Sequence, residues 1–290
     1  MGNPETADQI IAAATFRRNV YACIPQGASR ILDFGAGSGG LLLRLQRDKG
    51  CRELYGIEID RAASRPLRPL LDGLWHLNIE DPAQDLPAEY RGFFNYVVMH
   101  DVVEHLYDPW YCLARIRRWL APGGRLVLAT PNLQFWDFLL KLLSGEFPYG
   151  HGLWHVGHIR WFTVRSLVEM LAVAGFEIER LALEIHYNLD RASLESRRGV
   201  REVSLPPAEV AHLVPPDRTV RLAFPADVGP AYPVFLAHKL LAVCRAGAGD
   251  VEPVRMADDC DKLHRLRQAL NNPFDVYSPP RLELLVGDWC

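Results

Sequence analysis

The chain has 290 residues, with 32 Lys and Arg against 35 Asp and Glu, so its formal net charge of −3 gives no indication of a nucleic-acid partner. It is long enough to bury a sizeable core, and its six cysteines contain no Cys-x-x-Cys pair. No apolar run of about 18 residues and no secretory leader pattern occur, so we expect a cytoplasmic protein without a membrane span.

The predicted elements begin with a helix over Thr6 to Cys23, inside an N-terminal segment 1–27, with Thr6 as its N-cap. Short apolar runs then alternate with helix-length patterns. Strands are expected over 30–34, 53–58, 74–78, 94–99, 124–130 and 176–185. Helices are expected over 39–49, 61–71, 109–120 and 163–174. This alternation predicts a doubly wound α/β core over 28–186, in which helices cover both faces of a mostly parallel sheet.

The alternation breaks at residues 187–233, which are rich in arginine and proline and which we interpret as an inserted lobe or lid. The apolar run in 234–245 predicts one more core strand, placed next to the strand over 176–185. We expect the insertion to begin and end at the sheet edge opposite the ligand. The C-terminal extension 246–290 is expected to hold a helix near 256–270 and an irregular end from 272.

A glycine-rich turn, DFGAGSG over 33–39, joins the first core strand to the following helix. Glycines at 35, 37 and 39 leave the backbone N–H groups at the helix start open to a ligand. The alternative is that these glycines serve only the backbone angles of the turn. The turn lacks the Gly-Lys-Ser/Thr of a phosphate loop, which disfavours that class of phosphate site. A nicotinamide dehydrogenase is a less favoured alternative.

Glu58 ends the second core strand about 20 residues after the glycines, where a carboxylate is suited to accept hydrogen bonds from ribose hydroxyls. Asp60 could take that role instead. We expect Asp60 to cap the helix that begins near Arg61, which is the more usual role for an aspartate there.

Five blocks in order resemble the S-adenosylmethionine-dependent methyltransferases of the Rossmann-like class I, and most closely the small-molecule branch with the ubiquinone-biosynthesis O-methyltransferases. The blocks are ILDFGAGSG at 31–39, YGIEID at 55–60, NYVVMHDVVEHLYDP at 95–109, LAPGGRLVLATPN at 120–132 and HIRWFTVRSL at 158–167. The resemblance implies a Rossmann-like fold. It implies S-adenosyl-L-methionine as cofactor and S-adenosyl-L-homocysteine as product.

The resemblance also implies which residues hold the cofactor. The turn with Asp33, Gly35, Gly37 and Gly39 would face its methionine part and ribose. Glu58 would hold the ribose, Asn78 and Ile79 would face the adenine, and His100 would lie beside the sulfonium. The family often has Asp where Asn78 stands, but an amide can also pair with an adenine edge.

Histidines near the same sheet edge are candidates for a general base, because an oxygen acceptor benefits from losing its proton. The catalytic candidates are His105, His155 and His158, with His151 nearby in sequence. His155 and His158 are three residues apart and could share a helix face. Asp101 either faces the ligand edge or caps a short helix that contains His105. Aromatic residues over 135–154 are expected to line an acceptor pocket.

The leading hypothesis is in-line methyl transfer to an oxygen or nitrogen of a small-molecule metabolite, with no metal, nucleic acid or membrane involved. A homodimer is compatible with the sequence. One alternative is a metal-assisted RNA 2′-O-methyltransferase, since those enzymes resemble this chain in having a Glu-His block and a later pair of histidines. Another alternative is a regulatory protein that binds the cofactor without turnover.

Overall fold

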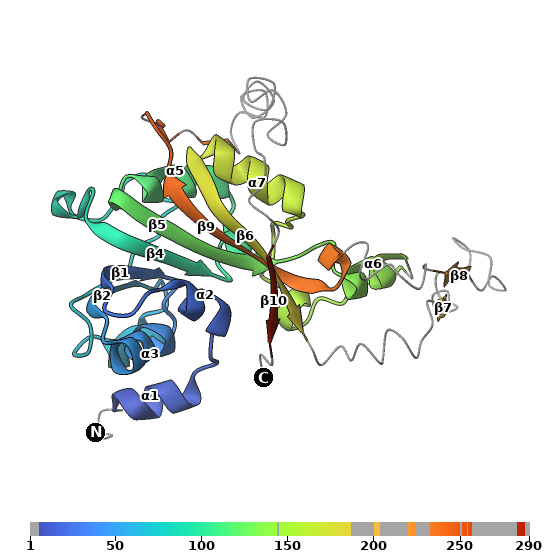
Figure 1. Ribbon diagram of the computed structural model, residues 1–290, viewed down its shortest axis with the longest axis horizontal. Coiled ribbons are helices and arrows are strands. Elements are labelled where there is room, and N and C mark those ends of the chain that lie inside the picture. Colours follow the sequence, from blue (N-terminus) through green and yellow to red (C-terminus); the bar gives the residue numbers. More distant parts are fainter. Residues whose placement is uncertain are drawn as a thin grey trace.

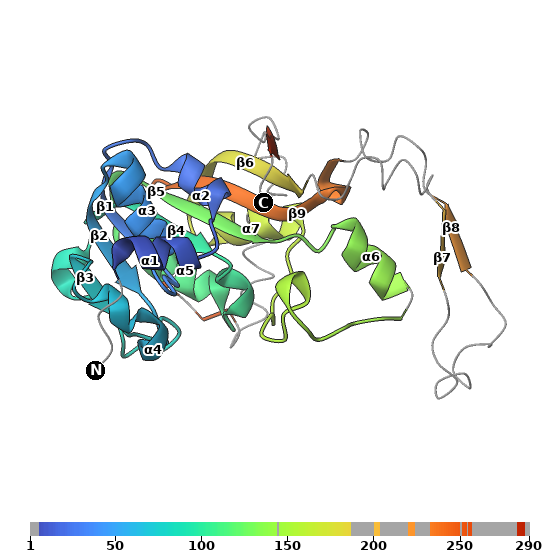
Figure 2. The same ribbon diagram turned by 90° about the horizontal axis from the view of Figure 1, so that it is seen from below.

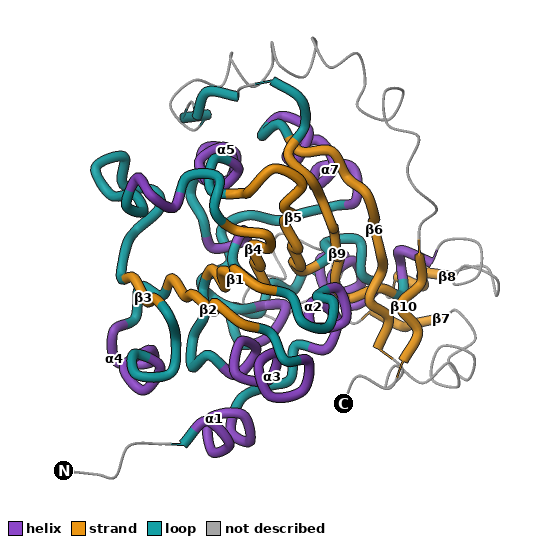
Figure 3. Tube along the Cα trace, turned by 60° about the vertical axis from the view of Figure 1, so that its left-hand side comes forward, coloured by secondary structure: helices purple, strands orange, loops and turns teal. Residues whose placement is uncertain are grey.

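A computed structural model describes residues 6–143, 145–186, 200–203, 220–223, 233–249, 251–253, 255–256 and 283–287. A central twisted sheet has helices on both faces, with α5 and α7 on one side and α2 and α3 on the other (Figure 1). The main sheet has the strand order β10-β6-β9-β5-β4-β1-β2-β3, which can be followed from strand to strand in Figure 3.

The strands of this sheet are mostly parallel. Their bounds are β1 Ser29–Phe34, β2 Arg52–Ile57, β3 Gly73–Trp75, β4 Phe94–His100, β5 Leu120–Pro131, β6 Phe176–His186, β9 Ala237–Ala246 and β10 Glu283–Gly287. β1 pairs in parallel with β2 and β4, and β4 pairs in parallel with β5. β9 lies antiparallel between β5 and β6, so the predicted neighbourhood of the last two core strands is confirmed. The doubly wound, Rossmann-like fold class is confirmed as well.

The α-helices mostly follow the predicted ranges. They are α1 Ala7–Ala13, α2 Arg18–Cys23, α3 Gly40–Lys49, α4 Arg61–Ser64, α5 Pro109–Arg117, α6 Trp136–Leu143 and α7 Val164–Val173. The 3₁₀ turns are η1 Arg65–Leu67, η2 Ala88–Tyr90, η3 Val103–His105, η4 Gly152–Trp154 and η6 Pro233–Phe235. Thr6 caps α1 as predicted, and it forms a capping box with Gln9.

Two helix predictions are wrong in extent. The single helix expected over Thr6 to Cys23 is two helices, because the chain turns extended at Ala14. The helix expected over 61–71 ends at Ser64, because Pro66 has no N–H to donate and its ring would clash with the preceding turn.

The two largest clusters of buried residues lie on opposite faces of the sheet. Val97 and Met99 of β4 belong to the same buried cluster as Leu113 of α5, whereas Val98 belongs to the cluster that contains Leu42 of α3. Successive residues of a strand point to opposite faces, so a strand covered on both sides needs this continuous apolar run.

The insertion 187–233 begins and ends at the carboxyl edge of the parallel strands. β6 runs antiparallel to β9, which runs antiparallel to β5, so β6 has the direction of the parallel strands. Its last residues pair with the first residues of β9, Ile185 with Ala237. The expectation that the insertion lies at the edge opposite the ligand is therefore wrong. Within it, β7 Val200–Val203 and β8 Val220–Ala223 form an antiparallel pair.

The C-terminal end was expected to be irregular, but it contains β10, which pairs in parallel with β6 and extends the sheet. The helix predicted near 256–270 lies outside the described residues, apart from Met256. Among the helices that the structure describes, none is long and apolar enough to cross a membrane.

Candidate active site

The glycine turn meets protein side chains at two of its three glycines. Gly35, Gly37 and Gly39 all have positive φ angles, of 79°, 53° and 78°. A Cβ on Gly35 would lie 2.7 Å from Cγ2 of Val102, and a Cβ on Gly39 would overlap the side chain of Leu67. A Cβ on Gly37 would meet nothing within 4 Å. Packing therefore explains the glycines at 35 and 39, whereas Gly37 faces open space where a ligand can approach.

Glu58 directly follows β2, and its carboxylate holds the glycine turn. Oε2 accepts a hydrogen bond from the Gly37 N–H at 2.7 Å, and Oε1 accepts one from the Asp60 N–H at 2.9 Å. Each carboxylate oxygen has a further lone pair, and the half-buried side chain leaves room for another donor. Asp60 caps α4 through the N–H groups of Ala62 and Ala63, so its predicted role is confirmed.

Asp33 is fully buried at the end region of β1, and neither of its carboxylate oxygens has a hydrogen-bond partner. Burial raises its pKa to about 6, Glu58 adds to the increase, and the guanidinium of Arg17 acts against it. Nη1 of Arg17 is also buried without a partner. An unpaired carboxylate beside an unpaired guanidinium complements a zwitterionic amino-acid group. Arg17 was missed from the sequence because it lies in the break between the two N-terminal helices.

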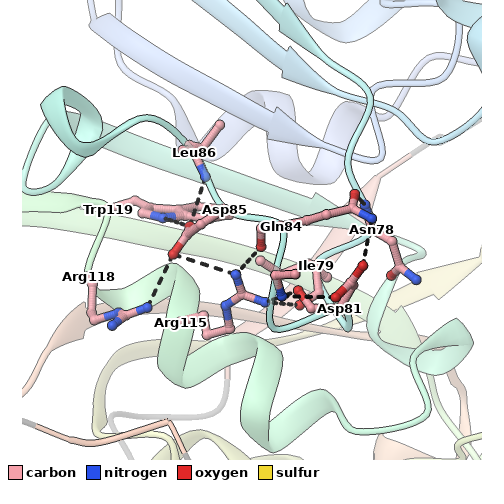
Figure 4. Close-up of polar contacts among 10 residues, drawn as sticks. Asn78, Ile79, Asp81, Gln84, Asp85, Leu86, Arg115, Arg118 and Trp119 are labelled. Atoms are coloured by element: carbon pink, nitrogen blue, oxygen red, sulfur yellow. Dashed lines mark hydrogen bonds and ion pairs between the residues drawn. The ribbon is translucent and has the colours of Figure 1, made fainter.

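Asn78 and Ile79 lie in the loop that follows β3 (Figure 4). The Asn78 side chain is exposed, and its amide oxygen accepts the Glu80 N–H at 3.0 Å. Its main-chain N–H donates to Oε1 of Gln84 at 2.8 Å, while Ile79 is buried. These contacts form a tight turn at the same sheet edge as the glycines.

His100 is the last residue of β4, Asp101 follows it, and both lie close to a lysine from β9. Nδ1 of His100 lies 3.1 Å from Oδ2 of Asp101, and the same oxygen accepts Nζ of Lys239 at 2.6 Å. Burial and then Lys239 lower the pKa of His100 to about 4, so this imidazole is neutral. Burial acts to raise the pKa of Asp101, but His100 and Lys239 outweigh it and hold that pKa well below its usual range.

Asp101 does not cap a helix, so that alternative is wrong. The following 3₁₀ turn η3 has Val102 at its N-cap and no side-chain cap, and Asp101 itself has a φ angle of 56°. This left-handed backbone costs energy in a residue with a Cβ. The ion pair with Lys239, 138 residues away in sequence, helps to hold it in place.

His105, His155 and His158 come together, with one ring nitrogen of each within 4.8 Å of the others. Nδ1 of His105 lies 2.9 Å from the carbonyl of Gly157, and Nδ1 of His158 lies 3.0 Å from that of Leu153. Both Nδ1 atoms must therefore carry the proton, which leaves the Nε2 lone pairs free. Burial lowers the pKa of His105 and of His158, so both rings are neutral at pH 7.

The shared helix face expected for His155 and His158 is wrong, because both residues lie in the turn after η4. Nδ1 of His155 instead accepts the Gly157 N–H at 3.0 Å, which places its proton on Nε2. His151 is exposed and does not belong to this cluster. At Nε2, His105 and His158 thus offer a ligand a lone pair, whereas His155 offers an N–H donor.

Glu104 is buried behind the histidines. Its Oε2 accepts the hydroxyl of Thr130 at 3.0 Å, and its Oε1 lies 4.0 Å from Nε2 of His158 without a hydrogen-bond partner. Burial, and to a smaller extent Asp101, raise the pKa of Glu104 to about 8. Its main-chain carbonyl accepts two N–H groups of the 159–160 segment, which holds the histidine turn against η3.

A cavity of about 690 Å³ opens beside these residues. Its walls include His100 and the three clustered histidines, together with the chain between α1 and α2 around Arg17, and Lys239. Among the aromatic residues expected to line an acceptor pocket, Phe135 lines this cavity. Trp136, Phe147 and Trp154 are not among its walls and pack with Phe135 in one apolar cluster. Figure 2 shows α6, which begins at Trp136, projecting from the end of the sheet. The walls do not include the glycine turn, Glu58, Asn78 or Ile79. Arg17 is close enough to both groups that its charge lowers the pKa of Asp33 and that of His100.

Comparison with known proteins places this arrangement in a family. Residues 9–181, more than half of the chain, match the family model described as a methyltransferase domain. The chain belongs to the class I S-adenosylmethionine-dependent methyltransferases. Its cofactor is therefore S-adenosylmethionine, and its sheet has the order and single antiparallel core strand of this fold.

Relatives of this methyltransferase include two ubiquinone biosynthesis O-methyltransferases. The protein from Cereibacter sphaeroides is 31% identical over 187 residues, which cover 60% of this chain and 72% of the relative. The protein from Psychrobacter arcticus is 30% identical over 168 residues, covering 55% of this chain and 63% of the relative. A solved S-adenosylmethionine-dependent methyltransferase from Archaeoglobus fulgidus is 15% identical and shares the fold, with a TM-score of 0.52 over 82% of this chain and 94% of that one.

Proposed function

We propose that this methyltransferase transfers a methyl group to an oxygen, or alternatively a nitrogen, of a small molecule bound in the cavity. The observation that carries the proposal is the cavity wall, where a neutral His105 presents an unused Nε2 lone pair beside the carboxyl edge of the sheet. The names of the relatives from Cereibacter sphaeroides and Psychrobacter arcticus support oxygen as the methylated atom.

The cofactor fits the unpaired groups at this edge. Asp33 would bind its α-ammonium and Arg17 its α-carboxylate. The fully buried Asp33 carboxylate would then gain the hydrogen-bond donor that it lacks. The open space at Gly37 would admit the nucleoside, with Glu58 accepting from the ribose hydroxyls and the turn at Asn78 facing the adenine. When bound, the cofactor supplies a methyl group that is already strongly electrophilic.

The protein's own task is then alignment and proton removal. His105 would take the acceptor's hydroxyl proton at Nε2, and the carbonyl of Gly157 fixes the ring by accepting its Nδ1–H. His158 lies next to it, with a ring-centroid distance of 4.7 Å, and its Nε2 faces Oε1 of Glu104. The cavity keeps the acceptor in place and limits the access of water.

The test is formation of S-adenosylhomocysteine from the cofactor with a panel of phenols, catechols and amines, followed by kinetics with the best acceptor. His105→Gln should lower kcat by about 100-fold, the usual contribution of a general base, and leave affinity for S-adenosylhomocysteine within about twofold. His151→Gln is the matched control, because His151 is an exposed histidine outside the cluster, and it should retain full activity.

Two outcomes would contradict the proposal. A His105→Gln enzyme with normal kcat would remove the general base from the mechanism. Turnover that occurs only with an RNA acceptor and an added divalent ion would favour the metal-assisted alternative instead.

A further inference from the structure

One buried arginine determines the shape of the loop over 78–86. Arg115, in α5, is only 2% exposed, and its Nη1 donates to the carbonyls of Ile79 at 2.6 Å and Asp81 at 2.8 Å. Its Nη2 donates to the carbonyl of Gln84. Figure 4 shows the guanidinium inside the curve of the loop, with three main-chain carbonyls turned toward it.

Asp85 ties the second half of the same loop to the end of α5. Its Oδ2 lies 3.5 Å from Nη2 of Arg115 and 3.3 Å from Nη2 of Arg118. Its Oδ1 accepts the indole N–H of Trp119 at 3.0 Å and the N–H of Leu86 at 2.8 Å. The aspartate and the arginine together connect the loop to one rigid helix (Figure 4).

A third contact connects the loop to the other end of α5. The main-chain N–H of Asp108, the N-cap residue of the helix, donates to Oε1 of Glu80 at 2.8 Å. The loop itself consists of turns and bends, without helix or strand. Two main-chain hydrogen bonds, from Asp81 to Asn78 and from Gln84 to Asp81, shape it locally. Its position against α5 depends on the side-chain contacts, of which Arg115 makes the most buried.

The contacts of Arg115 are of a kind that only a guanidinium provides. It is a rigid planar fork with five N–H donors, and hydrogen bonds from a charged donor are stronger than neutral ones. Without it, the carbonyls of Ile79 and Gln84 would lose their donor, and that of Asp81 would keep only the Gln84 N–H at 3.1 Å, which is costly where these groups are buried. The loop would then have to rearrange so that water could reach these groups.

We propose that Arg115 is a positioning residue for the cofactor's adenine. It touches no ligand itself, but it holds the turn of Asn78 and Ile79 in the shape that receives the base. The inference rests on the adenine site proposed above. It predicts that loss of Arg115 harms recognition of the adenine more than it harms the rest of the cofactor site.

Arg117 in the same helix provides a matched control. It also donates to three main-chain carbonyls, that of Gly175 at 2.9 Å and those of Gly247 and Gly249 at 2.5 Å each. Gly175 precedes β6 and Gly247 follows β9, so these carbonyls lie at the opposite edge of the sheet from the cofactor. Arg115→Gln and Arg117→Gln thus remove similar hydrogen bonds, but only Arg115 contacts the loop over 78–86.

The experiment measures binding of S-adenosylhomocysteine and of S-inosylhomocysteine, which has an oxo group in place of the adenine amine, by calorimetry on the full chain. Arg115→Gln should weaken S-adenosylhomocysteine binding by about tenfold, the loss expected when a hydrogen bond to the base is misplaced, and reduce the preference for it over the inosine analogue. Arg117→Gln should leave affinity within about twofold and the preference unchanged. Arg115→Lys should fall between Arg115→Gln and the wild type.

A folded Arg115→Gln protein with an unchanged preference would overturn the proposal, as would an equal loss in Arg117→Gln. Asn78→Ala separates this failure from failure of the adenine site. If Asn78→Ala alters the preference and Arg115→Gln does not, only the role of Arg115 is wrong. If neither alters it, the adenine site is wrong. If Arg115→Gln does not fold, Arg115→Lys and Asp85→Asn are measured in its place, and an unchanged preference in both overturns the proposal.

Discussion

Replacing Asp33 with asparagine tests whether this carboxylate is kept for a ligand at the expense of stability. Its pKa rises from 3.8 to about 6 in the folded protein, chiefly through burial. The folded state therefore binds this proton more tightly than the unfolded state does. The free energy of unfolding contributed by Asp33 falls as the pH rises from about 4 to about 6, and it stays low above that.

The magnitude follows from the shift in the pKa. About two pKa units correspond to roughly 3 kcal/mol, of which about 2 kcal/mol or more should appear between pH 4 and pH 8. Asparagine has no proton to lose in this range. The stability difference between Asp33→Asn and the wild type, both without ligand, should therefore shift in favour of the variant by that amount on going from pH 4 to pH 8.

Urea denaturation of the ligand-free proteins across this pH range measures the shift, and calorimetry at pH 8 measures affinity for S-adenosylhomocysteine. Asp33→Asn should bind it at least about tenfold more weakly, because the amide cannot form an ion pair with an ammonium. Asp108→Asn is the control: Asp108 is also buried, but its Oδ1 accepts the Tyr111 N–H at 3.0 Å. A stability difference that does not vary with pH, or an unchanged affinity, would refute the reasoning for Asp33.

Three further predictions concern the cofactor edge and the insertion. Glu58→Ala should weaken binding of S-adenosylhomocysteine at least about tenfold in calorimetry, since it removes an acceptor for the ribose, and unchanged affinity would exclude that role. Gly37→Val should abolish binding while circular dichroism shows a folded chain; Gly50→Val, with a similar φ of 63° and equally open space, is the control for backbone strain and should bind normally. Replacing 190–231 with a short Gly-Ser linker should leave cofactor affinity within about threefold and strongly lower acceptor turnover, and a deletion protein with normal turnover and oligomeric state would show that the insertion does not select the acceptor.

Local patterns in the sequence were sufficient for the fold and for part of the site. Apolar runs that alternate with helical patterns predict a parallel sheet with both faces covered, and such a sheet gathers the carboxyl ends of its strands at one edge. The glycine turn and His100 follow predicted strands and Glu58 ends one, so their positions at that edge follow from the chain order alone. Asp60 could be assigned as a cap because its partners, Ala62 and Ala63, are its near neighbours in sequence.

The remaining features depend on contacts between distant residues, which no local pattern specifies. Lys239 reaches Asp101 only because β9 lies antiparallel beside β5, and the same strand direction brings both ends of the insertion to the carboxyl edge. Arg17 approaches Asp33 only because the N-terminal helix breaks. In the sequence, nothing distinguishes Arg115 from other helix residues, because its contacts with the loop over 78–86 form only in the folded protein. The pattern of apolar and helical segments was therefore enough to predict the sheet and its binding edge. Which charged groups meet at that edge depends on strand register and on the course of the loops, and both are set by the packing of the whole chain.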